Sequence, residues 1–204
     1  MDQEVLRAVM VGCGGISRAW LDGIREISGV EMVGLVDLNE EAARLRAQEY
    51  ELDQAVIDTD LVAVLDETAP DVVFNCTVPE AHYDVTLTAL RAGAHVLGEK
   101  PLADSLVQAR EMVEVAESED RIFAVIQNRR YHPGIRRLRR FLASGAIGRI
   151  TTVNSDFYIG AHFGGFRDHM KHVLLVDMAI HTFDAARLIS GADATGVYCK
   201  EWNP

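Results

Sequence analysis

The chain has 204 residues, of which 49% are hydrophobic and 25% charged, and a formal net charge of −11. This composition indicates a folded protein with a sizeable core, and the negative charge argues against binding to nucleic acid or to anionic membrane surfaces. Three separated cysteines without CxxC spacing, no signal-peptide pattern and no apolar run of about 20 residues predict a soluble, cytoplasmic protein.

The first 126 residues alternate short apolar runs with helical patterns. Nearly continuous apolar runs are typical of parallel strands covered on both faces. The predicted strands are residues 5–11, 30–36, 71–77, 94–100 and 121–127. Residues 53–69 are ambiguous, and we interpret them as a short strand and a short helix. Strands that alternate with helices predict a domain over residues 1–126 with a Rossmann-type, doubly wound parallel sheet.

The helix after the strand at 94–100 is expected to begin at Asp104, whose side chain could cap it. Its predicted inward face consists of Leu106, Ala109, Val113 and Ala116.

After residue 127 the pattern changes. Pro133 starts an amphipathic helix, residues 149–159 alternate like an antiparallel strand with one solvated face, and a last strand is expected near 196–201. A long, mostly apolar helix is predicted over about 174–190, ended by Gly191. The predicted inward side chains of the Pro133 helix are Ile135, Leu138, Phe141 and Leu142. Residues 127–204 therefore predict an α+β domain with antiparallel strands.

The segment GCGGIS at 12–17 follows a predicted strand and opens a helix. Gly12 and Gly14 fill the first two positions of GxGxxG, where the turn is tight and the backbone approaches a diphosphate, and Ser17 fills the third. Asp37 ends the second strand, 25 residues after Gly12, near the place of a ribose 2′-hydroxyl acceptor. The alternative is a glycine turn in a sheet that binds no nucleotide.

Asp37 also bears on the choice of cofactor. A carboxylate accepts hydrogen bonds from two ribose hydroxyls and repels a 2′-phosphate, and no arginine follows it directly. The sequence favours NAD over NADP.

On the helix at 174–190, Asp177, His181 and Asp184 share one face at spacings i, i+4 and i+7. A carboxylate one turn from a histidine can orient its ring and raise its basicity, as a general base requires. A hydrogen-bonded core histidine explains the same spacing. A zinc site with the nearby histidines 162, 169 and 172 is a third alternative, although their spacing matches no familiar ligand pattern; we predict no metal.

Six arginines crowd into twelve residues, 129–140. They could form a phosphate-binding or nucleic-acid-binding patch, but the pattern favours a solvated face of the Pro133 helix. Cys13, inside the glycine loop, is interpreted as a small packing residue and not as a nucleophile.

Five segments occur in a characteristic order: GCGGIS, Asp37, NCTVPEAH at 75–82, GEKPLA at 98–103 and DMAIHTFD at 177–184. Together they resemble the glucose-fructose oxidoreductase / inositol dehydrogenase / MocA-type family, and the resemblance runs through essentially the whole chain. It implies an NAD-dependent dehydrogenase that transfers a hydride between nicotinamide and a secondary alcohol of a sugar or polyol.

The resemblance also implies the residues of the site. The catalytic residues would be Lys100, Asp177 and His181. The cofactor-binding residues would be Gly12, Gly14, Gly15, Ile16, Asp37, Thr77, Pro79, His82, Glu99 and Lys100. His181 would take the hydroxyl proton, Asp177 would orient His181, and Lys100 would stabilise the developing charge on oxygen. A cis peptide bond before Pro101 is expected, and the loop at His162, Phe166, Arg167 and His169 is expected to face the substrate.

Family members continue well past the position of Pro204, so the second domain, for substrate and oligomer contacts, is expected to be incomplete, and the full-length form to be a homo-oligomer. Two alternatives stay open: a catalytically inactive nucleotide-binding sensor or regulator, and an enzyme that uses NAD transiently, as glycosidases and dehydratases of the family do. The sequence leaves the substrate unnamed.

Overall fold

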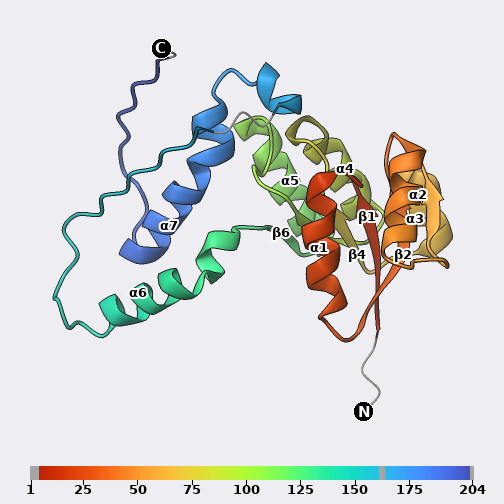
Figure 1. Ribbon diagram of the computed structural model, residues 1–204, viewed down its shortest axis with the longest axis horizontal. Coiled ribbons are helices and arrows are strands. Elements are labelled where there is room, and N and C mark those ends of the chain that lie inside the picture. Colours follow the sequence, from red (N-terminus) through yellow and green to blue (C-terminus); the bar gives the residue numbers. More distant parts are fainter. Residues whose placement is uncertain (1–4, 161–163, 203–204) are drawn as a thin grey trace. The chain divides into compact units, whose positions relative to one another are not determined.

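A computed structural model describes residues 5–160 and 164–202 (Figure 1). The chain divides into two compact units, Met1–Ile126 and Gln127–Pro204, called unit 1 and unit 2, and each is described by itself. Within the described ranges, no helix has both the length and the apolar character that crossing a membrane requires.

Unit 1 contains a six-stranded sheet in which every neighbouring pair is parallel. The strands are β1 (Leu6–Val11), β2 (Val30–Val36), β3 (Val56–Asp58), β4 (Val72–Asn75), β5 (His95–Gly98) and β6 (Phe123–Val125). Their order across the sheet is β3-β2-β1-β4-β5-β6, so the chain winds outward in two directions from the gap between β1 and β4. The predicted doubly wound parallel sheet is confirmed.

Helices cover both faces of this sheet. They are α1 (Gly15–Arg25), α2 (Glu40–Glu49), α3 (Leu61–Thr68), α4 (Pro79–Arg91) and α5 (Leu106–Ser118). Within β1, Met10 packs in a cluster with Leu21 of α1, whereas Val9 packs in another with Leu90 of α4. Because alternate residues of a strand point to opposite faces and both faces are covered, the buried part of β1, Ala8–Val11, is apolar without interruption.

The ambiguous stretch 53–69 forms β3 and α3. Asp60 explains where α3 begins, since its carboxylate accepts hydrogen bonds from the N–H groups of Val62 (2.9 Å) and Ala63 (3.4 Å).

Helix α5 differs from the prediction at two points. Its cap is Ser105, whose hydroxyl accepts the N–H of Gln108 at 3.3 Å, and not Asp104. Its buried residues are Met112 and Ala116, while Leu106 and Val113 are exposed. Positions 112 and 113 both lie one turn before 116, so helical spacing alone does not choose between them.

Unit 2 is built from short helices. They are the 3-10 helices Asn128–Tyr131 and Gly165–His169, α6 (Pro133–Ala143), a π-helical turn at Leu174–Met178, and α7 (Ile180–Ser190). The single helix expected over 174–190 is therefore divided in two. Gly191 ends α7 with a φ of +65°, as predicted.

The antiparallel strands predicted at 149–159 and 196–201 are not formed; among the described residues, all strands belong to unit 1. A strand exists only where a neighbour pairs with its N–H and C=O groups, and neither segment has such a neighbour among the described residues. Alternation in a sequence predicts which face would be buried, but it does not supply the partner.

Apolar side chains are less covered in unit 2 than predicted. All fully buried apolar side chains among the described residues lie in unit 1. On α6, the predicted inward residues Leu138 and Phe141 are exposed, and on α7 so is Phe183. The buried side chains here are instead Asp177, His181 and Asp184.

The turn after β1 requires glycine at position 12 because of its backbone conformation and its close contact with another part of the chain. Gly12 has a φ of +91°, and a Cβ built there would lie 2.6 Å from the carbonyl carbon of Cys76 and 2.8 Å from the nitrogen of Thr77. The positive φ disfavours any residue but glycine, and the close approach to the backbone just after β4 leaves no room for a Cβ.

Gly12→Ala should lower the free energy of unfolding by about 2–4 kcal/mol, because a positive φ and a backbone overlap are both penalised. Gly14→Ala is the matched control, since Gly14 has a negative φ and open space where its Cβ would be. Thermal unfolding followed by circular dichroism would measure both. Equal midpoints for the two variants would contradict this account of Gly12.

Candidate functional site

The glycine loop joins β1 to α1 at the carboxyl edge of the sheet. The N–H of Gly12 donates to the carbonyl of Val36 at the end of β2 (2.8 Å). Ser17 is fully buried, and its hydroxyl donates to the carbonyl of Gly14 at 2.6 Å, which suits the small-residue position of the motif. Apart from the adjoining residues and the backbone of α1 itself, no described atom lies within 4 Å of the positions that a Cβ on Gly14 or Gly15 would occupy. The loop therefore presents open backbone at the first turn of α1.

Asp37 lies beside this loop, where β2 ends. One carboxylate oxygen accepts the N–H of Cys13 (2.7 Å) and the other the N–H of Asn39 (2.9 Å). Asp37 thus holds the glycine loop in place, a role that sequence reasoning did not assign. Each carboxylate oxygen can accept a further hydrogen bond, so the side chain retains capacity for a ligand hydroxyl.

The thiols near the loop are packing groups. Cys13 and Cys76 are both buried. Burial, with the nearby Asp37 carboxylate, raises the pKa of the Cys13 thiol to about 12, and burial likewise raises the pKa of Cys76. Neutral thiols at physiological pH are poor nucleophiles, which agrees with the interpretation of Cys13 as a packing residue.

The next strand end, after β4, is held by polar contacts. The hydroxyl of Thr77 donates to the side-chain oxygen of Asn75 (2.6 Å). Pro79 is the first residue of α4. The ring of His82 is 2% exposed, with Nδ1 at 2.7 Å from the carbonyl oxygen of Pro101 and Nε2 at 3.1 Å from that of Thr77. His82 therefore joins two loops, and both its ring nitrogens face backbone rather than open space.

The loop after β5 carries Glu99 and Lys100. The Lys100–Pro101 peptide bond is cis, which confirms the expectation. Glu99 accepts the indole N–H of Trp20 in α1 (2.8 Å) and the backbone N–H of Lys100 (3.1 Å). The Glu99 carboxylate thus ties this loop to the helix that follows the glycine loop.

In unit 2 two buried carboxylates are each paired with an arginine. Nε of Arg167 donates to Asp177 at 2.6 Å, and Arg130 donates to Asp184 through two nitrogens at 2.6 to 2.9 Å. His181 is 9% exposed and lies on α7 between the two aspartates in sequence. Arg167 comes from the loop expected to face substrate, of which His162 lies outside the described residues.

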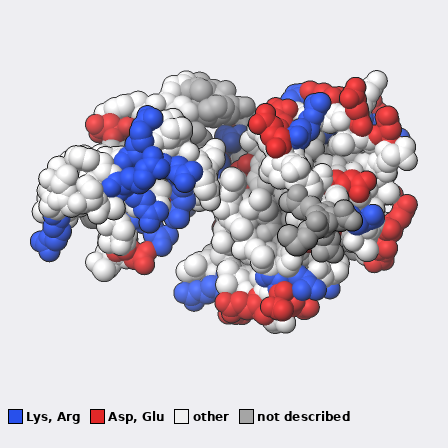
Figure 2. Space-filling view, turned by 90° about the horizontal axis from the view of Figure 1, so that it is seen from below, with Lys and Arg blue, Asp and Glu red and all other residues white. Residues whose placement is uncertain are grey.

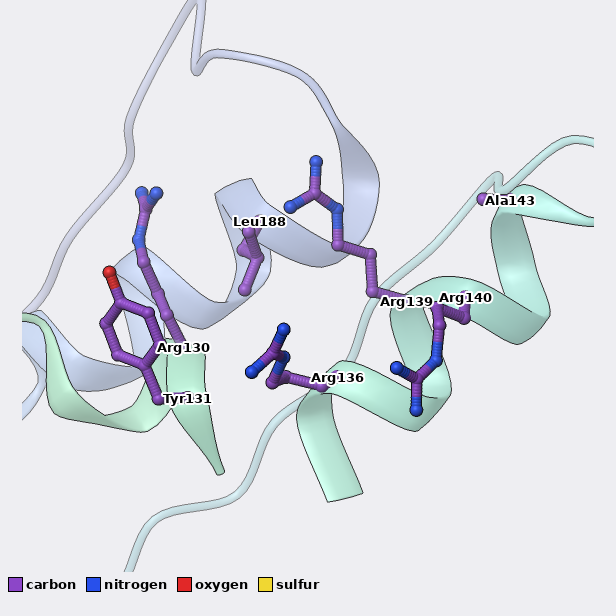
Figure 3. A pocket seen from close by; sticks show the side chains of 7 residues that line it. All are labelled: Arg130, Tyr131, Arg136, Arg139, Arg140, Ala143 and Leu188. Atoms are coloured by element: carbon purple, nitrogen blue, oxygen red, sulfur yellow. The ribbon is translucent and has the colours of Figure 1, made fainter. Parts of the chain in front are cut away.

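Four of the six arginines of 129–140 line a pocket of about 380 Å³ in unit 2 (Figure 3). Its lining residues are Arg130, Tyr131, Arg136, Arg139, Arg140, Ala143 and Leu188. The four arginines on α6 are exposed, as expected for a solvated face. Residues 127–204 carry eleven Lys and Arg against six Asp and Glu, a net charge of +5, so the acidic character of the chain resides in unit 1. Figure 2 shows a cluster of basic side chains on unit 2, whereas acidic and basic side chains are mixed on unit 1.

Family comparison covers most of the chain. Residues 6–127 match the model described as oxidoreductase family, NAD-binding Rossmann fold (GFO_IDH_MocA), and residues 135–203 match the GFO/IDH/MocA C-terminal domain.

Individual relatives are similar over almost the same span. The chain is 30% identical to 1,5-anhydro-D-fructose reductase of Ensifer adhaerens, covering 90% of this chain and 56% of that protein. It is 29% identical to D-glucoside 3-dehydrogenase of Escherichia coli K12, covering 95% and 56%. The crystal structure of myo-inositol dehydrogenase from Lactobacillus casei with NAD(H) and myo-inositol matches with a TM-score of 0.78 and 26% identity, covering 92% and 55%.

The chain spans about half the length of the curated relatives that it matches. The matched family models, taken with the sheet order and the glycine loop, agree with the resemblance seen in the sequence. The chain belongs to the GFO/IDH/MocA oxidoreductase family.

Proposed function

We propose that this protein is an NAD-dependent dehydrogenase that transfers a hydride between nicotinamide and a secondary alcohol of a sugar, polyol or related small molecule. Residues 1–126 would bind the cofactor, and residues 127–204 would contribute to the substrate and oligomer contacts. The relatives named above, which are a reductase and dehydrogenases of sugars and inositol, support the class of substrate.

The observation that carries the proposal is the order of the loops along the carboxyl edge of the sheet. Strands β2, β1, β4 and β5 are consecutive neighbours. The residues that follow the carboxyl ends of these strands are, in the same order, Asp37, the glycine loop, Thr77 and Lys100. That row spans three inter-strand gaps, about 14 Å. An extended dinucleotide fits it with ribose at Asp37, diphosphate at the glycine loop and nicotinamide toward Lys100.

The residues of unit 1 fit such a cofactor. The open backbone at Gly14 and Gly15 begins α1, where free N–H groups and the helix dipole favour a diphosphate. Ile16 lies in the same turn, and it is half exposed. Thr77 and Pro79 form the neighbouring strand end, while buried His82 and Glu99 support the loops around it.

Bound NAD supplies the hydride acceptor. We propose that His181 accepts the hydroxyl proton of the alcohol and that Asp177 orients His181. Lys100 would donate a hydrogen bond to the same oxygen and stabilise its negative charge as it develops. Lysine suits this role, because it presents a compact charge that binds a single oxygen.

The proposal includes the cellular setting. Three free cysteines, one of them exposed, support a reducing compartment such as the cytoplasm. The exposed apolar side chains of unit 2 support self-association of the protein as a homo-oligomer.

Asp37→Asn should weaken NAD binding by about 10-fold and bring the dissociation constants of NAD and NADP closer together, because the carboxylate charge is lost. The amide oxygen of asparagine can still accept the N–H of Cys13, so the loop contact has a replacement. Isothermal titration calorimetry with both dinucleotides would measure this. An unchanged NAD to NADP ratio would contradict the role of Asp37.

Lys100→Ala should lower the rate of NADH formation about 10²- to 10³-fold with a panel of polyols and sugars, because the developing charge loses its donor. NAD affinity should fall much less than the rate, because the other cofactor-binding residues remain. Lys200→Ala, at an exposed lysine, is the control. Full turnover in Lys100→Ala would refute its catalytic role, and tight NAD binding without any turnover by the unmodified protein would favour the sensor alternative.

A further inference from the structure

Arg46 is a buried arginine that the proposed mechanism does not use. It lies in α2, and its exposed fraction is 6%. Burial of a guanidinium is unfavourable unless its N–H groups find acceptors. The other buried residues of α2 are the small apolar residues Ala43 and Ala47. Arg46 is therefore the one charged residue on the buried face of this helix.

Arg46 has two acceptors in the glycine loop and one in its own helix. Nη2 donates to the carbonyl oxygens of Cys13 and Gly14, each at 3.1 Å. Nη1 forms an ion pair with Glu49, which also accepts hydrogen bonds from Nε of Arg18 at 2.9 and 3.1 Å. Two guanidinium groups share one carboxylate, so the group of three side chains keeps a positive charge behind the loop.

Peptide geometry links these carbonyls to the open side of the loop. In a planar trans peptide the C=O and the following N–H point in opposite directions. The Cys13 carbonyl shares its peptide with the N–H of Gly14, and the Gly14 carbonyl with that of Gly15. By binding both carbonyls, Arg46 turns the two N–H groups away from α2.

Those two N–H groups have no hydrogen-bond acceptor in the described part of the chain. Gly14 is the N-cap of α1 and Gly15 its first residue, where the N–H groups of a helix lack partners within the helix. The missing Cβ atoms leave open space at the same two residues. The two N–H groups are suitable donors for an anion, and Arg46 fixes their orientation by binding the carbonyls of the same peptides.

We propose that Arg46 is a positioning residue for the diphosphate of the dinucleotide: it fixes the N–H groups of Gly14 and Gly15 toward the phosphate oxygens and adds positive charge behind them. This inference rests on the proposed function. It assigns to α2, outside the glycine motif, a share of the affinity for the diphosphate.

The test compares ligands with and without the diphosphate. Arg46→Met keeps an unbranched apolar stem but removes the guanidinium with its charge and donors. It should weaken binding of ADP-ribose about 10- to 100-fold, as expected for loss of charge-assisted orientation, while adenosine binding stays within about 2-fold. Arg46→Lys should fall between, about 3- to 10-fold, because one ammonium serves fewer acceptors. Titrations followed by NMR would give both affinities.

Arg44→Met is the matched control, since Arg44 is an exposed arginine of the same helix that pairs with Glu40. It should leave both affinities unchanged. Unchanged ADP-ribose binding in Arg46→Met, or equal weakening of ADP-ribose and adenosine, would overturn the inference. If Arg46→Met does not fold, Arg46→Lys decides: weaker ADP-ribose binding with adenosine binding kept supports the inference, and wild-type affinity for ADP-ribose overturns it. Failure of the unmodified protein to bind NAD or ADP-ribose would instead refute the proposed function.

Discussion

The crossing of the Gly12 backbone over Cys76 and Thr77 is the constraint on which the candidate site depends. It brings the loop after β1 into contact with the loop after β4 with no side chain between them. From Thr77 a line of polar contacts continues through His82 to the carbonyl of Pro101. The loops at the switch point are therefore placed by backbone contacts and hydrogen bonds, above a core that is apolar on both faces.

The two units use different means of burial. Unit 1 buries apolar side chains on both faces of its sheet, and its acidic groups remain outside except where they hold loops, as Asp37 does. Among the residues of unit 2 that the structure describes, the buried side chains are two arginine-paired aspartates and His181. A buried ion pair contributes little net stability, but breaking it leaves a costly unpaired charge. These pairs therefore fix the positions of Asp177, in the π-helical turn, and of Asp184, in α7, more than they raise the stability of the fold.

The sheet could be predicted from sequence because burial on two faces forces uninterrupted apolar runs, and the glycine loop because its chemistry leaves few residue choices. Contacts between distant segments could not: Arg46 reaches the glycine loop only once α2 is packed. The sequence also did not show that Met112 of α5 is buried and Val113 exposed, since both positions are compatible with helical spacing from Ala116. The strand predicted at 149–159 failed for another reason, since alternation in a sequence does not provide a pairing partner.

Hydrogen exchange of the backbone amides at Gly14 and Gly15, with and without NAD, tests the central claim most directly. If the open first turn of α1 binds the diphosphate, exchange at these two amides should slow by at least about 10-fold at saturating NAD. The exchange of exposed amides on α6 should not change. Amides of Gly14 and Gly15 that exchange at the same rate with NAD bound would contradict the claim that this loop is the dinucleotide site.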